Sequence, residues 1–322
     1  MMRKVNLFTL DTPYREPLTV LGYEFGRQDA EKCVAIVGSM RGNEVEQTYV
    51  CADLVRRLAV LEEKGAMDPG KRVLVVPSVN AFSMNISERF WPVDKTDINR
   101  MFPGYDLGET TQRIADGLFS AVQGYAYGVQ LCSFYLPGDF QPHVRVTDAG
   151  PISQESLRMA DAFGFPYVVA KKPSSFDTTT LNYNWQVWDT HAFSVFVRDM
   201  GSLSTHNATE VEDCILRFLD DRGVVRFTLP GGFRSTHLDE SALVDVRSER
   251  AGGFFLRDVE PGERVRAGQT LGQVLDAGDA HVKEMLAAPI DGRVFFCHVD
   301  PLINQYTIAF KIAAETTWSH AE

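Results

Sequence analysis

The segment CVAIVGSMRGNEVEQ, residues 33–47, joins a short apolar run to a glycine-containing turn and the start of a helical pattern. The run Cys33–Val37 is apolar throughout, which is typical of a strand covered on both faces of a sheet. Asn43 is suited to cap a helix, and Glu44 is suited to its positively polarised N-terminus. A buried strand that feeds a helix in this way predicts an α/β fold, in which such turns often carry functional side chains.

The alternation of β-rich runs and helical patterns continues through the first two thirds of the chain. Strands are predicted over Cys33–Val37, Arg72–Val76, Gly128–Cys132, Tyr167–Ala170 and Phe193–Val197. Helices are predicted over Glu44–Lys64, Glu109–Val122, Ser153–Phe163 and Ala208–Arg222. Because several of the strands are continuous apolar runs, we expect a mixed, mostly parallel sheet with helices on both faces.

The pattern changes after about residue 225. The stretch RAGGFFLRDVEPGERVRAGQTLGQVLDAGDAHVKEMLAAPIDGRVFF, residues 250–296, consists of short apolar runs separated by glycine and Pro-Gly turn signals. No helix of useful length fits it, which favours a small all-β barrel or sandwich. We therefore predict an α/β domain over residues 1–225 and a β domain over residues 226–322, since 322 residues exceed what one core usually covers.

Bulk composition indicates a soluble globular protein: 44% of residues are hydrophobic and 23% are charged. A formal net charge of -11 argues against a nucleic-acid partner, although a pocket can still attract a small anion. Neither a secretory signal nor a membrane-spanning stretch is evident. Five widely spaced cysteines without a CxxC pair favour a reducing compartment, so we expect a cytoplasmic protein. A homo-oligomer is compatible with this length.

A second informative stretch is DKTDINRMFPG, residues 94–104, in which Asn99 and Arg100 stand side by side before a Pro-Gly turn. An arginine fork with a neighbouring amide is suited to bidentate capture of a carboxylate. Taken alone, an arginine beside an asparagine on a loop is more often solvated than part of a site.

Together with GSMRGNE, residues 38–44, this loop resembles the succinylglutamate desuccinylase/aspartoacylase family, zinc-dependent relatives of the carboxypeptidases. A strand followed by Gly-Asn-Glu is similar to the family's His-Gly-Asn-Glu metal loop. The stretch Asp97–Gly104 is similar to its Asp-Leu-Asn-Arg-x-Phe-Pro-Gly substrate loop. The C-terminal stretch resembles its second domain, a barrel-sandwich hybrid like that of biotinyl and lipoyl carriers. The resemblance implies a zinc-carboxypeptidase-like α/β domain and a small barrel-sandwich-hybrid domain.

The departures from the family pattern concern the metal ligands. The family binds zinc through a histidine and a glutamate three residues apart and through a later histidine. Here Glu44 is kept, but Arg41 stands at the first histidine position and Cys132 at the second. The best match to the family's general-base glutamate is Asp199, whose side chain is one methylene shorter. Because arginine stays protonated and offers only donors, the family's own zinc site is broken in this chain.

Two outcomes are open for this place. A rebuilt site could hold one Zn²⁺ or another divalent ion through Glu44, Cys132 and His143, with Asp139 as a substitute ligand. Alternatively, Arg41 and Glu44 form a salt bridge where the family holds its metal, and the pocket only binds. Cys132 would then be a small buried apolar residue and His143 a hydrogen-bonded loop residue.

The resemblance implies a metal-dependent deacylase that cleaves the amide of a small N-acyl amino acid or related carboxylate. Arg100 and Asn99 would hold the substrate carboxylate, with Arg89 as a second clamp, and Asp199 would act as the general base. The alternative is a retired hydrolase scaffold on which Arg41 and Arg100 bind a small anion without cleaving it. Trp185 and Trp188, before the Asp199 strand, could line the pocket or a subunit interface.

Overall fold

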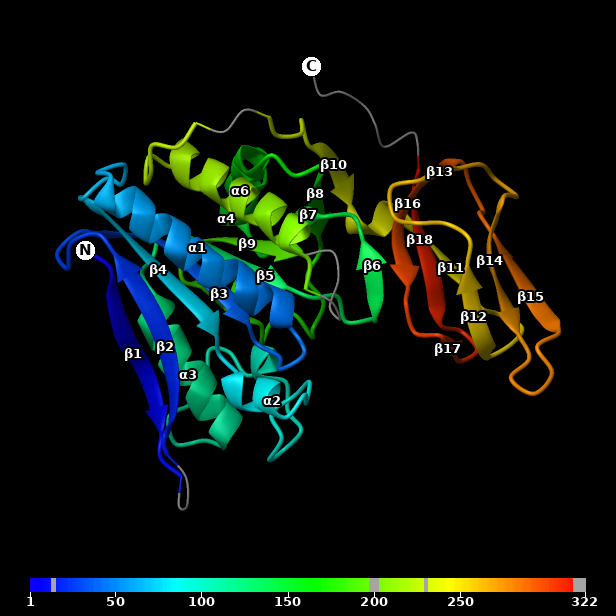
Figure 1. Cartoon of the computed structure of the whole chain (residues 1–322), viewed down its shortest axis with the longest axis horizontal. Helices are drawn as coiled ribbons and strands as arrows, with labels where there is room; N and C mark the ends of the chain where they lie inside the picture. Colours follow the sequence, from blue (N-terminus) through cyan, green and yellow to red (C-terminus); the bar gives the residue numbers. More distant parts are fainter. Residues whose placement is uncertain (13–15, 197–202, 229–230, 315–322) are drawn as a thin grey trace.

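The computed structural model describes residues 1–12, 16–196, 203–228 and 231–314, which form an α/β part and a smaller all-β part (Figure 1). The α/β part is built on a nine-stranded sheet in the order β1-β2-β4-β3-β5-β9-β7-β8-β10. These strands are β1 Arg3–Leu10, β2 Leu18–Phe25, β3 Glu31–Ser39, β4 Lys71–Ser78, β5 Tyr127–Cys132, β7 His143–Thr147, β8 Tyr167–Lys171, β9 His191–Phe196 and β10 Thr236–Asp239. Five of the eight strand pairs are parallel, so the predicted mixed, mostly parallel sheet is confirmed.

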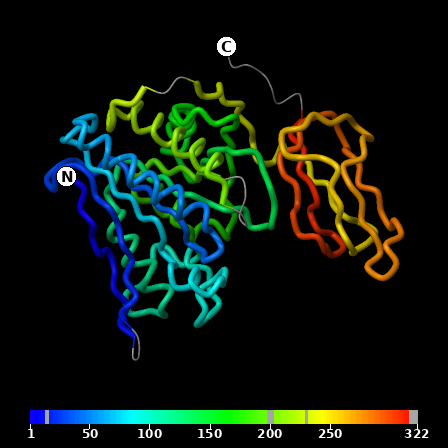
Figure 2. The backbone as a smooth tube through the Cα atoms, viewed as in Figure 1, coloured from blue at the N-terminus to red at the C-terminus, as the bar shows by residue number. Residues whose placement is uncertain are grey.

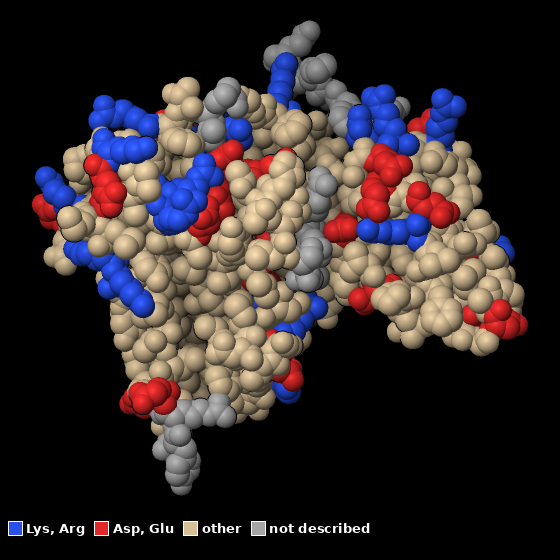
Figure 3. Space-filling view, in the orientation of Figure 1, with Lys and Arg blue, Asp and Glu red and all other residues tan. Residues whose placement is uncertain are grey.

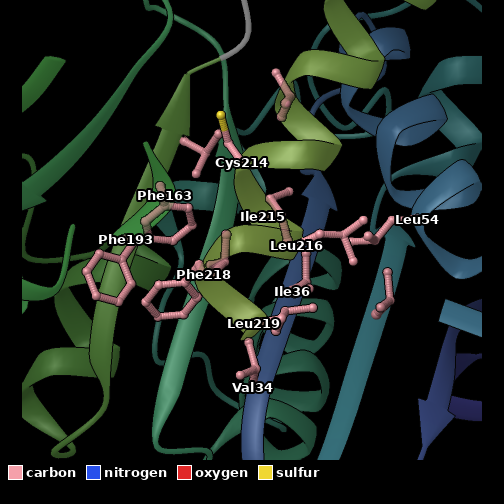
Figure 4. Close-up of a cluster of buried hydrophobic side chains, with 14 of the residues drawn as sticks. Val34, Ile36, Leu54, Phe163, Phe193, Cys214, Ile215, Leu216, Phe218 and Leu219 are labelled. Atoms are coloured by element: carbon pink, nitrogen blue, oxygen red, sulfur yellow. The ribbon is translucent and has the colours of Figure 1, made fainter. Parts of the chain in front are cut away.

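Helices cover both faces of this sheet, as predicted. They are α1 Val45–Glu63, α2 Ala81–Asn85, α3 Thr110–Val122, α4 Pro151–Met159, α5 Leu181–Val187 and α6 Thr205–Asp221. Helices α1 and α6 pack on one face of the sheet and form one apolar core with it. Helices α3 and α5 pack on the opposite face and form a second core. In the first core, Phe163, Phe193 and Phe218 lie together beside α6 (Figure 4), with the rings of Phe163 and Phe218 stacked 4.2 Å apart.

The five predicted strands and four predicted helices are present, with small differences at their ends. The predicted helix Ser153–Phe163 is divided into α4 and a 3-10 turn at Ala160–Phe163. The hairpin of β1 and β2, the strands β7 and β10, and helix α5 were not predicted. Trp185 of α5 is fully buried against Gly128, where an added Cβ would lie 2.5 Å from the indole, so this tryptophan lines neither a pocket nor an interface.

The C-terminal part folds as two antiparallel sheets around their own apolar core. One sheet has the order β11-β18-β16-β13 and the other the order β15-β14-β12-β17. The strands are β11 Leu243–Arg247, β12 Gly253–Arg257, β13 Arg264–Val265, β14 Thr270–Leu275, β15 Val282–Ala287, β16 Gly292–His298, β17 Leu302–Ile303 and β18 Ile308–Ala314. As expected, the described residues of this region contain no helix beyond the 3-10 turn Glu240–Ala242.

The two parts are joined by more than the connecting chain. Strand β6, Gly138–Phe140, leaves the α/β part and pairs with β16 in the C-terminal sheet, as the chain trace shows (Figure 2). Conversely, strand β10 follows the predicted boundary in the chain but belongs to the large sheet of the α/β part, where it pairs with β8. The division of the chain at residues 225 and 226 stays a prediction.

No helix within the described residues is long and apolar enough to cross a bilayer. On the face drawn in Figure 3, acidic side chains stand among the lysines and arginines, and the basic groups do not merge into one continuous patch.

One ionisable group couples the packing of α1 and α6 to pH. Glu212 of α6 is 1% exposed and accepts from Arg57 of α1 at 2.9 Å, while Asp53 and Asp213 stand beside it. Burial, reinforced by Asp53, raises the pKa of Glu212 to about 7, although Arg57 opposes the rise. The folded state therefore favours the protonated carboxyl, which stabilises the fold at low pH and loses this contribution as the pH rises through 7.

We expect Glu212→Gln to remove this pH dependence, because the amide keeps the shape of the protonated carboxyl and cannot ionise. Relative to wild type, the variant should gain up to about 3 kcal/mol of unfolding free energy between about pH 5 and about pH 8. Urea denaturation of the wild type and the variant at both pH values measures this difference in unfolding free energy. Parallel pH profiles for the two proteins would show that Glu212 titrates normally.

Candidate functional site

A cavity of about 180 Å³ lies at the carboxyl ends of β3 and β5, the edge at which open α/β sheets commonly bind ligands. The chain beyond β3 contributes Arg41 and Glu44, and the end of β5 contributes Cys132 and Ser133. The 3-10 turn Ile98–Arg100 closes another side. The two stretches singled out from the sequence therefore meet in one pocket.

The floor of the pocket is held by a buried charge cluster centred on Arg41. Its guanidinium donates from Nη1 to Glu44 at 3.0 Å, and from Nη2 and Nε to Asp97 at 2.7 and 3.2 Å. Nη1 also donates to the Ser133 hydroxyl at 3.3 Å. Arg41 is 6% exposed. Burial opposes its charge, but Glu44 and Asp97 outweigh burial and raise the pKa of Arg41 above its ordinary value.

Both carboxylate oxygens of Glu44 are engaged. Oε2 accepts the backbone N–H groups of Met40 and Arg41 at 2.9 and 3.0 Å, which fixes the turn before α1. Oε1 accepts from the Arg41 guanidinium and from the Ser133 hydroxyl. Glu44 thus has four donors around it inside the protein and is 1% exposed.

Cys132, predicted as a metal ligand or a small buried apolar residue, also lines the pocket. Its Sγ lies 3.6 Å from the carbonyl oxygen of Gln130, and burial raises the pKa of the thiol to about 11. The neutral thiol is therefore the form present near pH 7, whereas a metal ligand or nucleophile would be the thiolate.

His143 is not part of the pocket lining. It begins β7, where Nδ1 is 2.8 Å from the carbonyl oxygen of Gln141 and the ring stacks 4.6 Å from that of Phe196. Burial lowers its pKa to about 3, so it is a neutral core residue. Asp139, the substitute ligand, pairs with Arg257 at 3.0 Å. The structure therefore does not bring Glu44, Cys132 and His143 together as a metal site.

Within the described residues, one group of His, Cys, Asp or Glu has three ligand atoms within 4.8 Å of one another. It consists of Asp276, Asp279 and His281 in the loop between β14 and β15, where two of the three side chains are exposed. This loop belongs to the C-terminal part, and none of its residues lines the pocket. Asp276 is already 3.2 Å from the ammonium of Lys283.

Arg100 and Asn99, the predicted carboxylate clamp, both line the pocket, and their role as a clamp stays a prediction. The Asn99 oxygen accepts from Gln130 Nε2 at 3.1 Å and from the Leu181 backbone N–H at 3.3 Å, which leaves its NH₂ group as the donor side. The Arg100 Nη1 donates to the Phe176 carbonyl. Among the described residues, Arg100 has no salt bridge, so its charge is available to an anion.

Two predicted site residues remain, Arg89 and Asp199. Arg89 lies beside the pocket rather than in its lining, donates to the Tyr135 carbonyl at 3.2 Å and lies over the rings of Phe90 and Tyr135. Burial, followed by the nearby charge of Arg41, lowers the pKa of Arg89. Asp199, the predicted general base, lies outside the described residues.

Sequence reasoning missed the cations contributed by β7 and β8. Arg145 lies 4.4 Å from the centre of the Phe196 ring and 3.4 Å from Glu240, and Lys171 pairs with Asp177 at 2.8 Å. Although burial works against it, the bonds from Lys171 and Ser174 hold the pKa of Asp177 at about 2. Neither cation had a local signal, because only the pairing of the strands brings them to the pocket.

Comparison with known proteins assigns the chain to a family. The model of the succinylglutamate desuccinylase/aspartoacylase catalytic domain matches residues 30–222, which include β3, the loop with Arg100 and β5. The chain belongs to the succinylglutamate desuccinylase/aspartoacylase family. The resemblance predicted from the two loops is thereby confirmed, and the protein is a homologue of amide-bond deacylases.

Individual relatives agree with this assignment. The N-alpha-acetyl-L-2,4-diaminobutyric acid deacetylase of Halomonas elongata is 30% identical over 139 residues, which span 42% of this chain and 38% of that enzyme. The crystal structure of a succinylglutamate desuccinylase from Silicibacter sp. covers 97% of this chain and 94% of its own, with 17% identity and a TM-score of 0.84. The product-bound structure of the ectoine utilization protein EutE of Ruegeria pomeroyi matches 97% of this chain and 95% of its own chain, with 17% identity and a TM-score of 0.80. These structures establish the shared fold.

The family resemblance implies a zinc ion at the positions of Arg41, Glu44 and Cys132, but the residues present in this family member do not fit one. A fixed guanidinium stands in place of a neutral imidazole, and both oxygens of Glu44 already accept hydrogen bonds. Of the two outcomes left open by the sequence, the salt bridge between Arg41 and Glu44 is the one that forms, with Asp97 as a third member.

Proposed function

We propose that the protein is an amide deacylase whose pocket beyond β3 and β5 binds a small N-acyl amino acid or a related carboxylate. Family membership and the deacetylase relative support the reaction class. The observation that carries the substrate class is Arg100, a pocket guanidinium without a carboxylate partner among the described residues. A cavity of about 180 Å³ limits the substrate to a small metabolite.

In this proposal, Arg100 pairs with the substrate carboxylate and the Asn99 amide donates to it. Arg41 contributes a fixed positive charge beside which the acyl oxygen lies, since Arg41, Glu44 and Ser133 all line the same cavity. Asp199 takes a proton from the attacking water as the general base. Attack of the water oxygen on the acyl carbon forms a tetrahedral intermediate, Asp199 returns the proton to the amide nitrogen, and the C–N bond breaks to release a carboxylic acid and a free amine.

Arg100→Lys is expected to weaken binding of N-acyl amino acids although the positive charge is kept. Lysine lacks the planar fork that makes two parallel hydrogen bonds, so we expect a loss of roughly 1.5–3 kcal/mol, or about ten- to a hundredfold in affinity. Calorimetry with a panel of N-acetyl and N-succinyl amino acids measures the change. In the same panel, release of the free amino acid tests the deacylase reaction.

Arg158→Lys, a matched change at an exposed position on α4, should leave affinity unchanged. If Arg100→Lys behaves like this control, Arg100 does not contact the carboxylate and the assignment of the pocket fails.

A second candidate function is binding of the same carboxylates without hydrolysis. The observation in its favour is the saturated cluster of Arg41, Glu44 and Asp97, which occupies the place of the family's metal. The two functions differ in one readout, because a pure binding protein gives calorimetric heats with the panel but no free amine.

We also propose that the α/β part at residues 1–225 carries this chemistry. Residues 226–322 would then form a barrel-sandwich-hybrid domain that supports it through the pairing of β6 with β16.

A further inference from the structure

A second and larger cavity, of about 500 Å³, lies between the α/β part and the C-terminal β part. Helix α6 forms one wall, the stretch before β8 forms another, and Gly262 and Arg293 close it from the C-terminal side. It shares no lining residue with the pocket that holds Arg41 and Arg100. Any role of this cavity is therefore independent of the proposed deacylase function.

The inner wall of this interdomain cavity is apolar. Phe165, Val211 and Cys214 are almost fully buried and contribute to its lining, and Tyr167 adds an aromatic ring. Phe233 stands at the rim with most of its side chain exposed. Such a wall accepts a hydrocarbon or aromatic body.

A positive charge faces the same space. The guanidinium of Arg217 donates weakly from Nη1 to the Cys214 sulfur at 3.5 Å, and its Nε is buried without a hydrogen-bond partner. No salt bridge among the described residues includes Arg217. Gly232 lies against this group, since an added Cβ there would be in van der Waals contact with Nε at 3.4 Å.

The acids of the cavity do not neutralise Arg217. Asp213 is held at 2.6 Å by Arg57, and Glu210 faces His206 at 3.5 Å on the solvent side of α6. Two further arginines, at positions 234 and 293, also line the cavity. The balance of charge is positive, and the Arg217 donors are the ones left for a ligand.

We propose that the interdomain cavity is a second ligand site that takes a small organic anion with an apolar body, such as an aryl or alkyl carboxylate. Its carboxylate pairs with Arg217, and its apolar body packs against Phe165 and Tyr167. Because the walls come from both parts of the chain, a bound ligand stabilises the contact between them.

Calorimetry on the full chain tests this site with benzoate as the anionic probe and benzamide as its uncharged analogue of similar shape. We expect benzoate to bind at millimolar concentration and benzamide to bind at least about tenfold more weakly. Arg217→Met, which keeps the length of the side chain without its charge, should lower benzoate affinity by about tenfold or more. Arg217→Lys should recover part of it.

Arg158→Met, a matched change at an exposed position on α4, serves as the control and should leave benzoate affinity unchanged. Loss of binding in Arg158→Met as large as in Arg217→Met, equal binding of benzamide, or no benzoate binding by the wild type would each overturn the proposal. A crystal of the wild type soaked in 4-bromobenzoate gives an answer that does not depend on any variant folding. Anomalous density for bromine beside Arg217 supports the second site, whereas density confined to the Arg100 pocket refutes it.

Discussion

Arg41→Ala is expected to lower the free energy of unfolding by about 3–5 kcal/mol, the cost of leaving buried charges without their partner. The guanidinium supplies four hydrogen bonds, one to Glu44, two to Asp97 and one to Ser133. With alanine at position 41, the carboxylates of Glu44 and Asp97 lose their compensating cation and face a cavity. Their side chains are only 1% and 13% exposed. Urea denaturation near neutral pH measures the loss.

A matched control exists on α1, where Arg56 pairs with Asp53 at 2.6 Å but is 68% exposed. Arg56→Ala should lower the free energy of unfolding far less than Arg41→Ala does, because solvent screens the exposed pair and hydration replaces it. If Arg41→Ala costs no more than Arg56→Ala, the buried cluster does not hold the pocket floor as described.

The sequence predicted most of the sheet because its central strands are continuous apolar runs. Cys33–Val37 is an unbroken run and Gly128–Cys132 is interrupted only by Gln130, and both lie in the middle of the sheet. The strand β7 has only two apolar positions, Val144 and Val146, and sits after a polar stretch, so it had no comparable pattern. The strand β10 is four residues long and forms by pairing with the edge strand β8. This pairing is a long-range contact, so the local sequence around β10 does not indicate it.

The candidate site shows the same division between local and distant information. The meeting of Arg41 with Glu44 could be foreseen, since the two are three residues apart on one turn. Asp97 could not, because 56 residues separate it from Arg41 and only the fold joins them. Its signal was present in hindsight, since a buried guanidinium has five N–H donors and one glutamate cannot accept from all of them.

His143 illustrates how closeness in sequence misleads. It stands eleven residues after Cys132, and this spacing suggested a shared metal. Between them the chain crosses to the C-terminal sheet as β6 and returns as β7, which runs antiparallel to β9. The return places His143 among Phe140, Phe196 and Phe295, where a neutral ring is favoured over a ligand.

The double change Arg41→His with Cys132→His is expected to raise zinc affinity by several orders of magnitude. It supplies two imidazole nitrogens, removes one fixed positive charge and releases Glu44 from its guanidinium partner. Competition with a chromogenic chelator compares the double variant with wild type and with each single variant, which should gain much less. Elemental analysis of wild type purified without chelator should find no zinc at this site.

Glu44 provides a control for this experiment. Adding Glu44→Gln to the double variant removes the one ligand that the family pattern and this chain share, and it should abolish most of the gain. A folded double variant that binds no more zinc than wild type would show that residues 41 and 132 do not occupy the ligand positions. In that case the guanidinium of Arg41 could not be the replacement for a metal, and the charge cluster of Arg41, Glu44 and Asp97 would have to be understood as a structural feature of the turn before α1.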